Sequence, residues 1–144
     1  MRNKLKSGSY GLLLLAFLVF TPQAYSASCS NATLTGAYGS QDTQNGYDFN
    51  WFIVDLMKFD GNGHGTVAWE AWQRNDRTTN VTPPPGFGFT YSVNPNCTFT
   101  FVHDNGLTFS GVIVKNGEEL RYVETTGWEF RMGTAVKANT ENQN

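Results

Sequence analysis

The chain has 144 residues, two cysteines and a formal net charge of −2 at neutral pH. This length allows one domain with a modest core. The acidic balance, with no basic stripe, argues against nucleic acid or an anionic membrane as the main partner. We therefore expect neither a nucleic-acid partner nor membrane insertion.

Residues 1–26 have the pattern of a secretory signal peptide. Three basic residues precede an apolar run of about nine residues, 12–20, and small residues follow at Ala24 and Ser26. The run is shorter than the roughly 20 residues of a membrane-spanning helix, which is the first alternative. Cleavage after Ser26 leaves one domain, 27–137, and a polar tail, 138–144, that we expect to be disordered. We predict a secreted or periplasmic protein.

Cys29 and Cys97 are the only cysteines of the chain. In an oxidising compartment they predict one disulfide. Closing a loop of about 70 residues is worth about 4 kcal/mol in the chain-entropy model. A lipoprotein is a second alternative, because Cys29 follows the apolar run, but lipidation there would leave Cys97 unpaired.

Almost every later segment has the composition of a β-strand, with Asp, Asn and Gly marking the turns. Eight strands are expected, over residues 34–41, 48–59, 64–73, 87–93, 97–103, 107–115, 118–126 and 128–137. Most turns are short, which is typical of an antiparallel meander. Closing the first strand onto the eighth would remove both exposed edges. We therefore predict an all-β fold, a single eight-stranded antiparallel up-and-down barrel, with a sandwich as the alternative.

One longer connection, 74–86, contains three consecutive prolines, which favour a stiff extended stretch. We expect this irregular loop to cap or rim one mouth of the barrel, either as a functional lid or as a plain connector.

Alternation along the strands predicts an interior rich in aromatic side chains. Trp128, Phe130 and Met132 share one face of the last strand, and we place Arg131 on the outside. A barrel of eight strands is either filled by its own side chains or holds one small ligand. We predict an apolar lumen for an apolar or aromatic small molecule. Its predicted ligand-binding residues are Trp51, Phe87, Phe89, Tyr91, Tyr122, Trp128 and Phe130.

The second strand is apolar on both faces. Phe52, Val54 and Leu56 alternate with Trp51 and Ile53. A two-sided apolar strand predicts that its outer face meets a partner subunit or is covered by a loop or terminus. Homo-oligomerisation through this strand is therefore one expectation.

Two carboxylates are candidate catalytic residues. Asp55 lies within the most apolar strand, where burial would raise its pKa and suit it to proton transfer. Its alternative role is structural, through bonds to backbone, Tyr or Arg. Glu70, flanked by Trp69 and Trp72, is a general base or binding group if it faces inward and a solvated charge if it faces outward. Tyr91 and Tyr122 are the candidate partners of either carboxylate.

No metal site or cofactor is predicted. His64 and His103 lie far apart in the sequence, whereas a zinc site needs three or four clustered ligands. The chain also has no P-loop, dinucleotide fingerprint or nucleophile elbow.

Four motifs span nearly the whole mature chain: CSNATLTGAYG at 29–39, FDGNG at 59–63, YSVNPNCT at 91–98 and GTA at 133–135. Together they resemble a group of small secreted bacterial proteins, mostly of unknown function. The resemblance implies the Cys29–Cys97 bridge, because cysteines in that group fall at the same places. The architecture also resembles calycin and allene oxide cyclase-type barrels, although Tyr38 stands where lipocalins have Trp in their opening Gly-x-Trp. Such barrels bind apolar ligands or catalyse cyclisation and isomerisation, and the resemblance assigns no catalytic residue.

The leading hypothesis is a secreted or periplasmic barrel that binds a small molecule. The second is a cofactor-free isomerase, cyclase or lyase that uses a buried carboxylate and a tyrosine. The third is a structural or surface-interaction protein with a filled barrel, which would act through the outer face of the second strand.

Overall fold

The computed structural model describes residues 28–45, 50–74, 77–81, 87–127 and 130–138. The predicted signal peptide and tail lie outside these residues and stay predictions. The elements are η1 (Asn31–Thr33), β1 (Thr35–Asn45), β2 (Asn50–Asp60), β3 (His64–Arg74), β4 (Arg77–Val81), β5 (Gly88–Val93), β6 (Thr98–His103), β7 (Thr108–Val114), η2 (Lys115–Gly117), β8 (Glu119–Glu124) and β9 (Phe130–Lys137).

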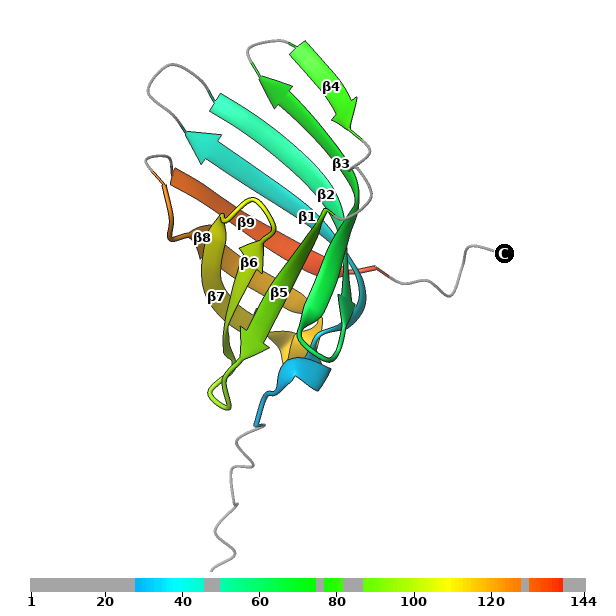
Figure 1. Cartoon of the computed structure of the whole chain (residues 1–144), viewed down its shortest axis with the longest axis vertical. Helices are drawn as coiled ribbons and strands as arrows, with labels where there is room; N and C mark the ends of the chain where they lie inside the picture. Colours follow the sequence, from blue (N-terminus) through cyan, green and yellow to red (C-terminus); the bar gives the residue numbers. More distant parts are fainter. Residues whose placement is uncertain (1–27, 46–49, 75–76, 82–86, 128–129, 139–144) are drawn as a thin grey trace, which may run out of the picture.

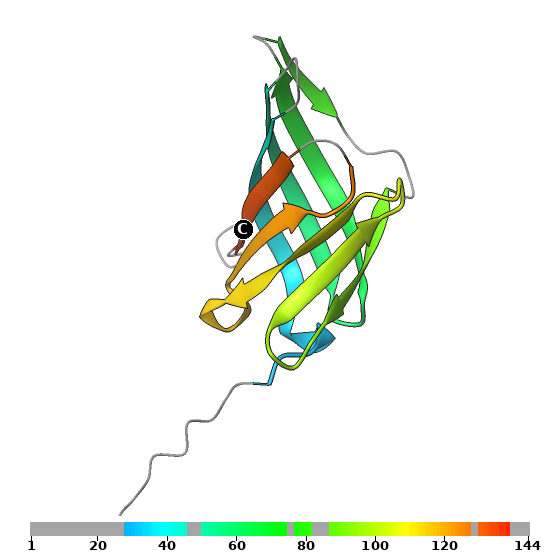
Figure 2. The ribbon, with the colours of Figure 1, turned by 90° about the vertical axis from the view of Figure 1, so that its left-hand side faces the viewer.

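Eight of the strands form a closed antiparallel barrel, as predicted. The order around the barrel is β1, β2, β3, β5, β6, β7, β8 and β9, and β9 pairs with β1 to complete the ring. Figures 1 and 2 show this barrel from two sides. Closure gives every barrel strand two neighbours, which satisfies backbone groups that an open sheet would leave unpaired.

The barrel wall is uneven, because β1, β2 and β3 each have 11 residues whereas β5 and β6 each have six. The first part of β3 pairs with β5, and its last part, Glu70–Arg74, pairs with β4 instead. The long strands and β4 therefore continue past the short strands as a curved sheet (Figure 1, top). We call this sheet the extension, and the end of the barrel beneath it the open end.

Strand β4 corrects the prediction that 74–86 is one irregular loop. Its sequence, RTTNV, has two β-branched threonines and a valine, and it pairs antiparallel with the last part of β3. Pairing with β4 provides hydrogen-bond partners for the backbone groups of β3 at the point where β5 no longer reaches it.

The N-terminal segment closes the opposite end of the barrel. Its 3-10 turn, η1, leads to Leu34, which is fully buried, and Tyr91 donates a hydrogen bond to the Leu34 carbonyl at 3.0 Å. Tyr38 donates to a carbonyl of η2 at 2.6 Å. The predicted disulfide joins Cys29 to Cys97 and ties this segment to the turn before β6. We call this end the closed end.

Aromatic rings fill the barrel from the closed end upward. Phe101 stacks on Phe109 with ring centroids 4.6 Å apart, and Phe59 meets Phe89 edge-to-face at 5.0 Å. Rings packed in this way stabilise a core beyond the area they bury. The larger buried side chains of this core are Leu34, Tyr38, Met57, Phe59, Phe89, Tyr91, Phe99, Phe101, Phe109, Ile113, Leu120 and Tyr122.

Strand β9 faces the opposite way from the prediction. Phe130 is 79% exposed and Met132 is 53% exposed, whereas the Arg131 side chain is only 10% exposed. The inner row of β9 is Arg131, Gly133 and Ala135. The reason is electrostatic and steric, because Arg131 finds carboxylate partners inside the barrel and its two inner neighbours are small. Trp128 lies outside the described residues.

The outer face of β2 is apolar, as its sequence indicated. Phe52 and Val54 are exposed there, and Trp69 of β3 is exposed beside them. A partner for this face stays a prediction. In the part of the chain that the structure describes, no helix is long and apolar enough to cross a membrane.

Candidate functional site

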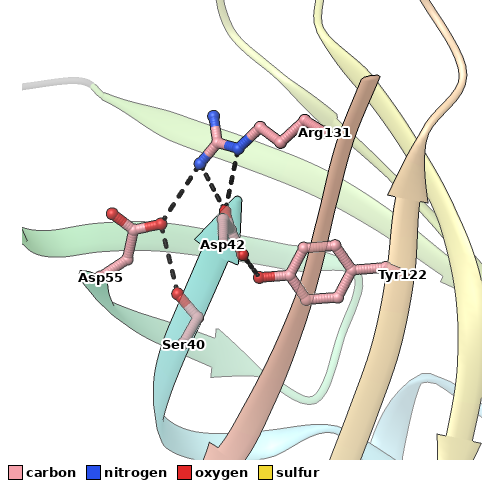
Figure 3. A network of polar contacts seen from close by, with 5 residues as sticks. All are labelled: Ser40, Asp42, Asp55, Tyr122 and Arg131. Carbon is pink, nitrogen blue, oxygen red and sulfur yellow. Dashed lines mark hydrogen bonds and ion pairs between the residues drawn. The ribbon is translucent and has the colours of Figure 1, made fainter. Parts of the chain in front are cut away.

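A cluster of polar side chains lies inside the barrel, between the aromatic core and the extension. It consists of Ser40 and Asp42 from β1, Asp55 from β2, Tyr122 from β8 and Arg131 from β9 (Figure 3). We call these five residues the polar cluster. Buried polar groups are costly unless they are paired, so such a cluster inside a small barrel requires explanation.

Asp42 is the centre of the polar cluster. Its Oδ2 accepts hydrogen bonds from Nε and Nη2 of Arg131, at 2.9 and 2.5 Å. Its Oδ1 accepts one from the Tyr122 hydroxyl at 2.5 Å. Asp42 is only 2% exposed, and these three charge-assisted bonds compensate its burial.

Gly133 makes this arrangement possible. A Cβ at position 133 would lie 1.9 Å from Oδ1 of Asp42 and 2.7 Å from the Tyr122 ring. Any side chain at position 133 would therefore push Asp42 and Tyr122 apart.

The environment keeps Tyr122 and Arg131 in their ordinary protonation states. Burial, and then the nearby Asp42 charge, raise the pKa of Tyr122 well above 10, so its hydroxyl keeps its proton. Burial alone would lower the pKa of Arg131, but the Asp42 carboxylate beside it raises the pKa overall. These two side chains hold Asp42, and neither is suited to accept a proton.

Asp55 is the least satisfied member of the polar cluster. Its Oδ2 accepts a hydrogen bond from Ser40 at 3.2 Å and lies 3.5 Å from Nη2 of Arg131. Its Oδ1 is buried and has no hydrogen-bond partner within the described residues. Burial, and then the Asp42 charge, raise the pKa of Asp55 to about 7, against the opposing effect of Arg131. Asp55 therefore exchanges a proton near neutral pH.

Glu70 lies on the same inner face as Asp55, because the two residues are directly opposite in the β2–β3 register. A β-bulge one residue pair away, where Leu56 faces Trp69 but Met57 faces Val67, sets this orientation. Glu70 is half-buried. The sequence left its direction open, and the structure selects the inward one.

Two tryptophans lie on the same inner face as these carboxylates, farther along the extension. Trp72 is two residues beyond Glu70 on β3 and is paired with Ile53 of β2. Its ring centroid lies 4.5 Å from that of Trp51. Both indoles are half-buried, so part of each ring surface is accessible at the open end.

Three of the predicted ligand-binding residues, Phe87, Phe89 and Tyr91, belong to the aromatic core or pack against it. Phe89 and Tyr91 are buried against Phe59, and Phe87 packs at the edge of the core against His103. Burial, and then the Arg131 charge, lower the pKa of His103 to about 4, so its imidazole is neutral at neutral pH. Phe130 lies outside the barrel. Of the predicted ligand-binding residues, Trp51 and Tyr122 lie near the carboxylates.

Sequence reasoning missed Ser40, Asp42 and Arg131. Asp42 follows Ser40 and Tyr38 at a spacing of two along β1, and this alternation was the available signal for an inward carboxylate. No local signal marks Arg131 as inward, because its partners are 89 and 76 residues away.

Two hollows that are lined by described residues lie elsewhere on the surface. The larger, of about 620 Å³, is a wide depression on the outer wall that includes Thr43, Ser110, Arg121 and Thr134. The smaller, of about 320 Å³, lies by the β2–β3 turn near Lys58 and His64. Neither is lined by a residue of the polar cluster other than Tyr122, and both are broadly open to solvent.

Comparison of the chain with protein-family models, with curated proteins and with solved structures gave no match. The resemblance to small secreted bacterial barrels therefore stays a prediction. Among the described residues, no three carboxylate, imidazole or thiol groups are gathered closely enough to hold a metal ion.

Proposed function

We propose that this protein binds a small organic molecule at the open end of the barrel, above the polar cluster. The observation that supports this proposal most directly is the buried Oδ1 atom of Asp55, which has no hydrogen-bond partner among the described residues. An unpaired buried carboxylate oxygen costs about 1–3 kcal/mol or more, which a ligand able to hydrogen-bond to it would recover. Asp42, Arg131 and Tyr122 satisfy one another, so the Oδ1 atom of Asp55 is left for another role.

From the sequence we expected an apolar lumen that binds the ligand inside the barrel. The site that we propose lies only at the open end. The aromatic core occupies the half near the closed end, so the ligand would contact Trp51 and Trp72 of the extension instead. Small-molecule sites commonly combine aromatic walls with a few polar groups that fix orientation. Here Asp55 and Glu70 supply the polar groups.

A matched pair of tryptophan variants tests this proposal. Trp72 faces inward on β3, and Trp69 faces outward three residues earlier. Binding of the neutral solvatochromic dye Nile red should weaken in Trp72→Ala and stay unchanged in Trp69→Ala. The opposite result would assign dye binding to the apolar outer face and would contradict a site at the open end.

A second candidate function is a cofactor-free enzyme, favoured by the pKa of Asp55 near 7. A group with such a pKa is suited to general acid–base catalysis at neutral pH. Tyr122 does not fit the partner role expected from the sequence, because its hydroxyl is committed to Asp42. The pH–rate profile of any turnover should show a limb near pH 7 that is lost in Asp55→Asn. A limb that persists in this variant would exclude Asp55 as the proton-transfer group.

We also propose that the protein is exported. The disulfide between Cys29 and Cys97 supports this, since such bonds persist in oxidising compartments. Fractionation of cells that express the full chain should recover it in the periplasm or the medium, and recovery in the cytosol with free thiols would contradict export.

A further inference from the structure

Two carboxylates of like charge are opposite each other on the inner face of β2 and β3. Asp55 and Glu70 are register partners, and side chains at such positions have Cβ atoms roughly 4.5–5.5 Å apart. Like charges directly opposite each other destabilise a sheet. In the described part of the chain Glu70 has neither an ion-pair nor a hydrogen-bond partner, and Oδ1 of Asp55 also has none. Among the described residues, therefore, nothing pairs with Glu70 or with the Oδ1 atom of Asp55.

Arg131, a buried cation among the described residues, does not resolve this repulsion. Arg131 gives two hydrogen bonds to Asp42 and reaches Asp55 only at 3.5 Å. Figure 3 shows its guanidinium contacting Asp42 through two nitrogens and Asp55 through one of them. Arg131 and Asp42 cancel each other in charge. Counting the described side chains alone, Glu70, together with Asp55 whenever it is ionised, leaves the site negative.

Aromatic surface adjoins the same two carboxylates. Trp72 follows Glu70 at a spacing of two on the inner face, and its ring meets that of Trp51 at 4.5 Å. Indole faces attract cations, and they do so more strongly where water is partly excluded. Carboxylates beside half-buried indoles favour an organic cation over a bare metal ion, in keeping with the lack of a metal-ligand cluster in the described residues.

We propose that the ligand is an organic ammonium on an aromatic or apolar body, with its ammonium group held between Asp55 and Glu70 and its body against Trp72. This inference rests on the proposed binding function and specifies its ligand class. An ammonium group can donate a hydrogen bond to each carboxylate, including the unpartnered Oδ1 of Asp55. Its positive charge also offsets the repulsion across the β2–β3 pair.

Such binding is linked to a proton. The charged groups that face Asp55 are Asp42 from β1, Glu70 from β3 and Arg131 from β9, and Ser40 donates a hydrogen bond to it. An ammonium ligand binds best when Asp55 is ionised, so binding at acidic pH expels its proton. Affinity for the ligand should then rise with pH, by up to about 100-fold between pH 5 and pH 8.

Three probes of one size separate charge from shape: 2-phenylethylamine, 2-phenylethanol and phenylacetate. Binding to the mature, disulfide-bonded chain is followed at pH 8 by tryptophan emission and by calorimetry. The amine should bind at least about tenfold more tightly than the alcohol, and phenylacetate should bind most weakly. Glu70→Gln and Asp55→Asn should each remove most of this preference. Glu118→Gln, which removes an exposed carboxylate in the β7–β8 turn, is the matched control and should retain it.

The outcomes distinguish this inference from the proposed function. Equal binding of the amine and the alcohol overturns the ammonium ligand and leaves small-molecule binding in place. Preferential binding of phenylacetate overturns it as well and assigns recognition to Arg131. If none of the three binds at about 10 mM, the ammonium inference fails, and the proposed function fails with it only if Nile red binding is also insensitive to Trp72→Ala. A preference that survives in both Glu70→Gln and Asp55→Asn overturns the assigned carboxylates.

Discussion

The Asp55→Asn variant should gain stability relative to the parent protein as pH rises. The folded state raises the pKa of Asp55 from its ordinary value of 3.8 to about 7. The protonated carboxyl therefore favours the folded state. This contribution is full below about pH 4 and is lost as pH rises through about 7. By proton linkage, the free energy of unfolding should fall by about 3 kcal/mol between pH 5 and pH 8 because of Asp55. This is a large fraction of a small domain's stability.

The Asn side chain cannot ionise, and it imitates the protonated acid in shape. Urea unfolding of both proteins at pH 5, 6, 7 and 8 gives the free energy of unfolding at each pH. The difference between the two should move by about 2–3 kcal/mol in favour of Asp55→Asn across this range. His103 titrates in the opposite sense, because its folded pKa of about 4 lies below its ordinary 6.5. Because His103 is present in both proteins, its contribution cancels in the difference between their free energies of unfolding. Parallel stability curves would refute the assignment of Asp55 as a buried carboxyl that titrates near neutrality.

Three further outcomes follow from the fold. Replacing Cys29 and Cys97 together by Ser should lower the free energy of unfolding by about 4 kcal/mol, measured in urea, and intact mass with and without reductant should show one intramolecular bridge in the parent. Gly133→Ala should cost at least about 2 kcal/mol, because its Cβ collides with Asp42 and Tyr122, whereas Gly39→Ala, where a Cβ meets nothing within 4 Å, should stay within about 0.5 kcal/mol of the parent. Terminal sequencing of the exported protein should begin at residue 27, and a start at residue 1 would exclude a cleaved signal peptide.

The barrel could be predicted because its signals are local. Each turn carries its own Asp, Asn or Gly, and alternation along a strand identifies two faces without knowledge of the rest of the chain. Strand β5 is an example, since Phe89 and Tyr91 are buried as predicted. Strand β4 was missed because a five-residue strand of RTTNV has a weak signal, and what stabilises it is its pairing with β3.

The site was less predictable because alternation does not say which face is inside. On β9 the more apolar face was expected inward, yet Phe130 is outside and Arg131 is inside. Arg131 faces inward because of Asp42 and Asp55, which are far away in sequence. The inward direction of Glu70 likewise depends on a bulge at the β2–β3 pair. Asp55 was identified correctly as buried, because a carboxylate on the inner face of an apolar strand is a signal in itself.

The two ends of this barrel differ in a way that matters for handling the protein. Cys29 and η1 lie at the closed end, whereas the extension with Trp51 and Trp72 lies at the other (Figure 1). A linker joined just ahead of Cys29 would leave the barrel on the side remote from the extension. Molecules immobilised through such a linker would present their open ends to the solution, which suits surface-based sensors. The disulfide would also hold the anchoring segment against the turn before β6.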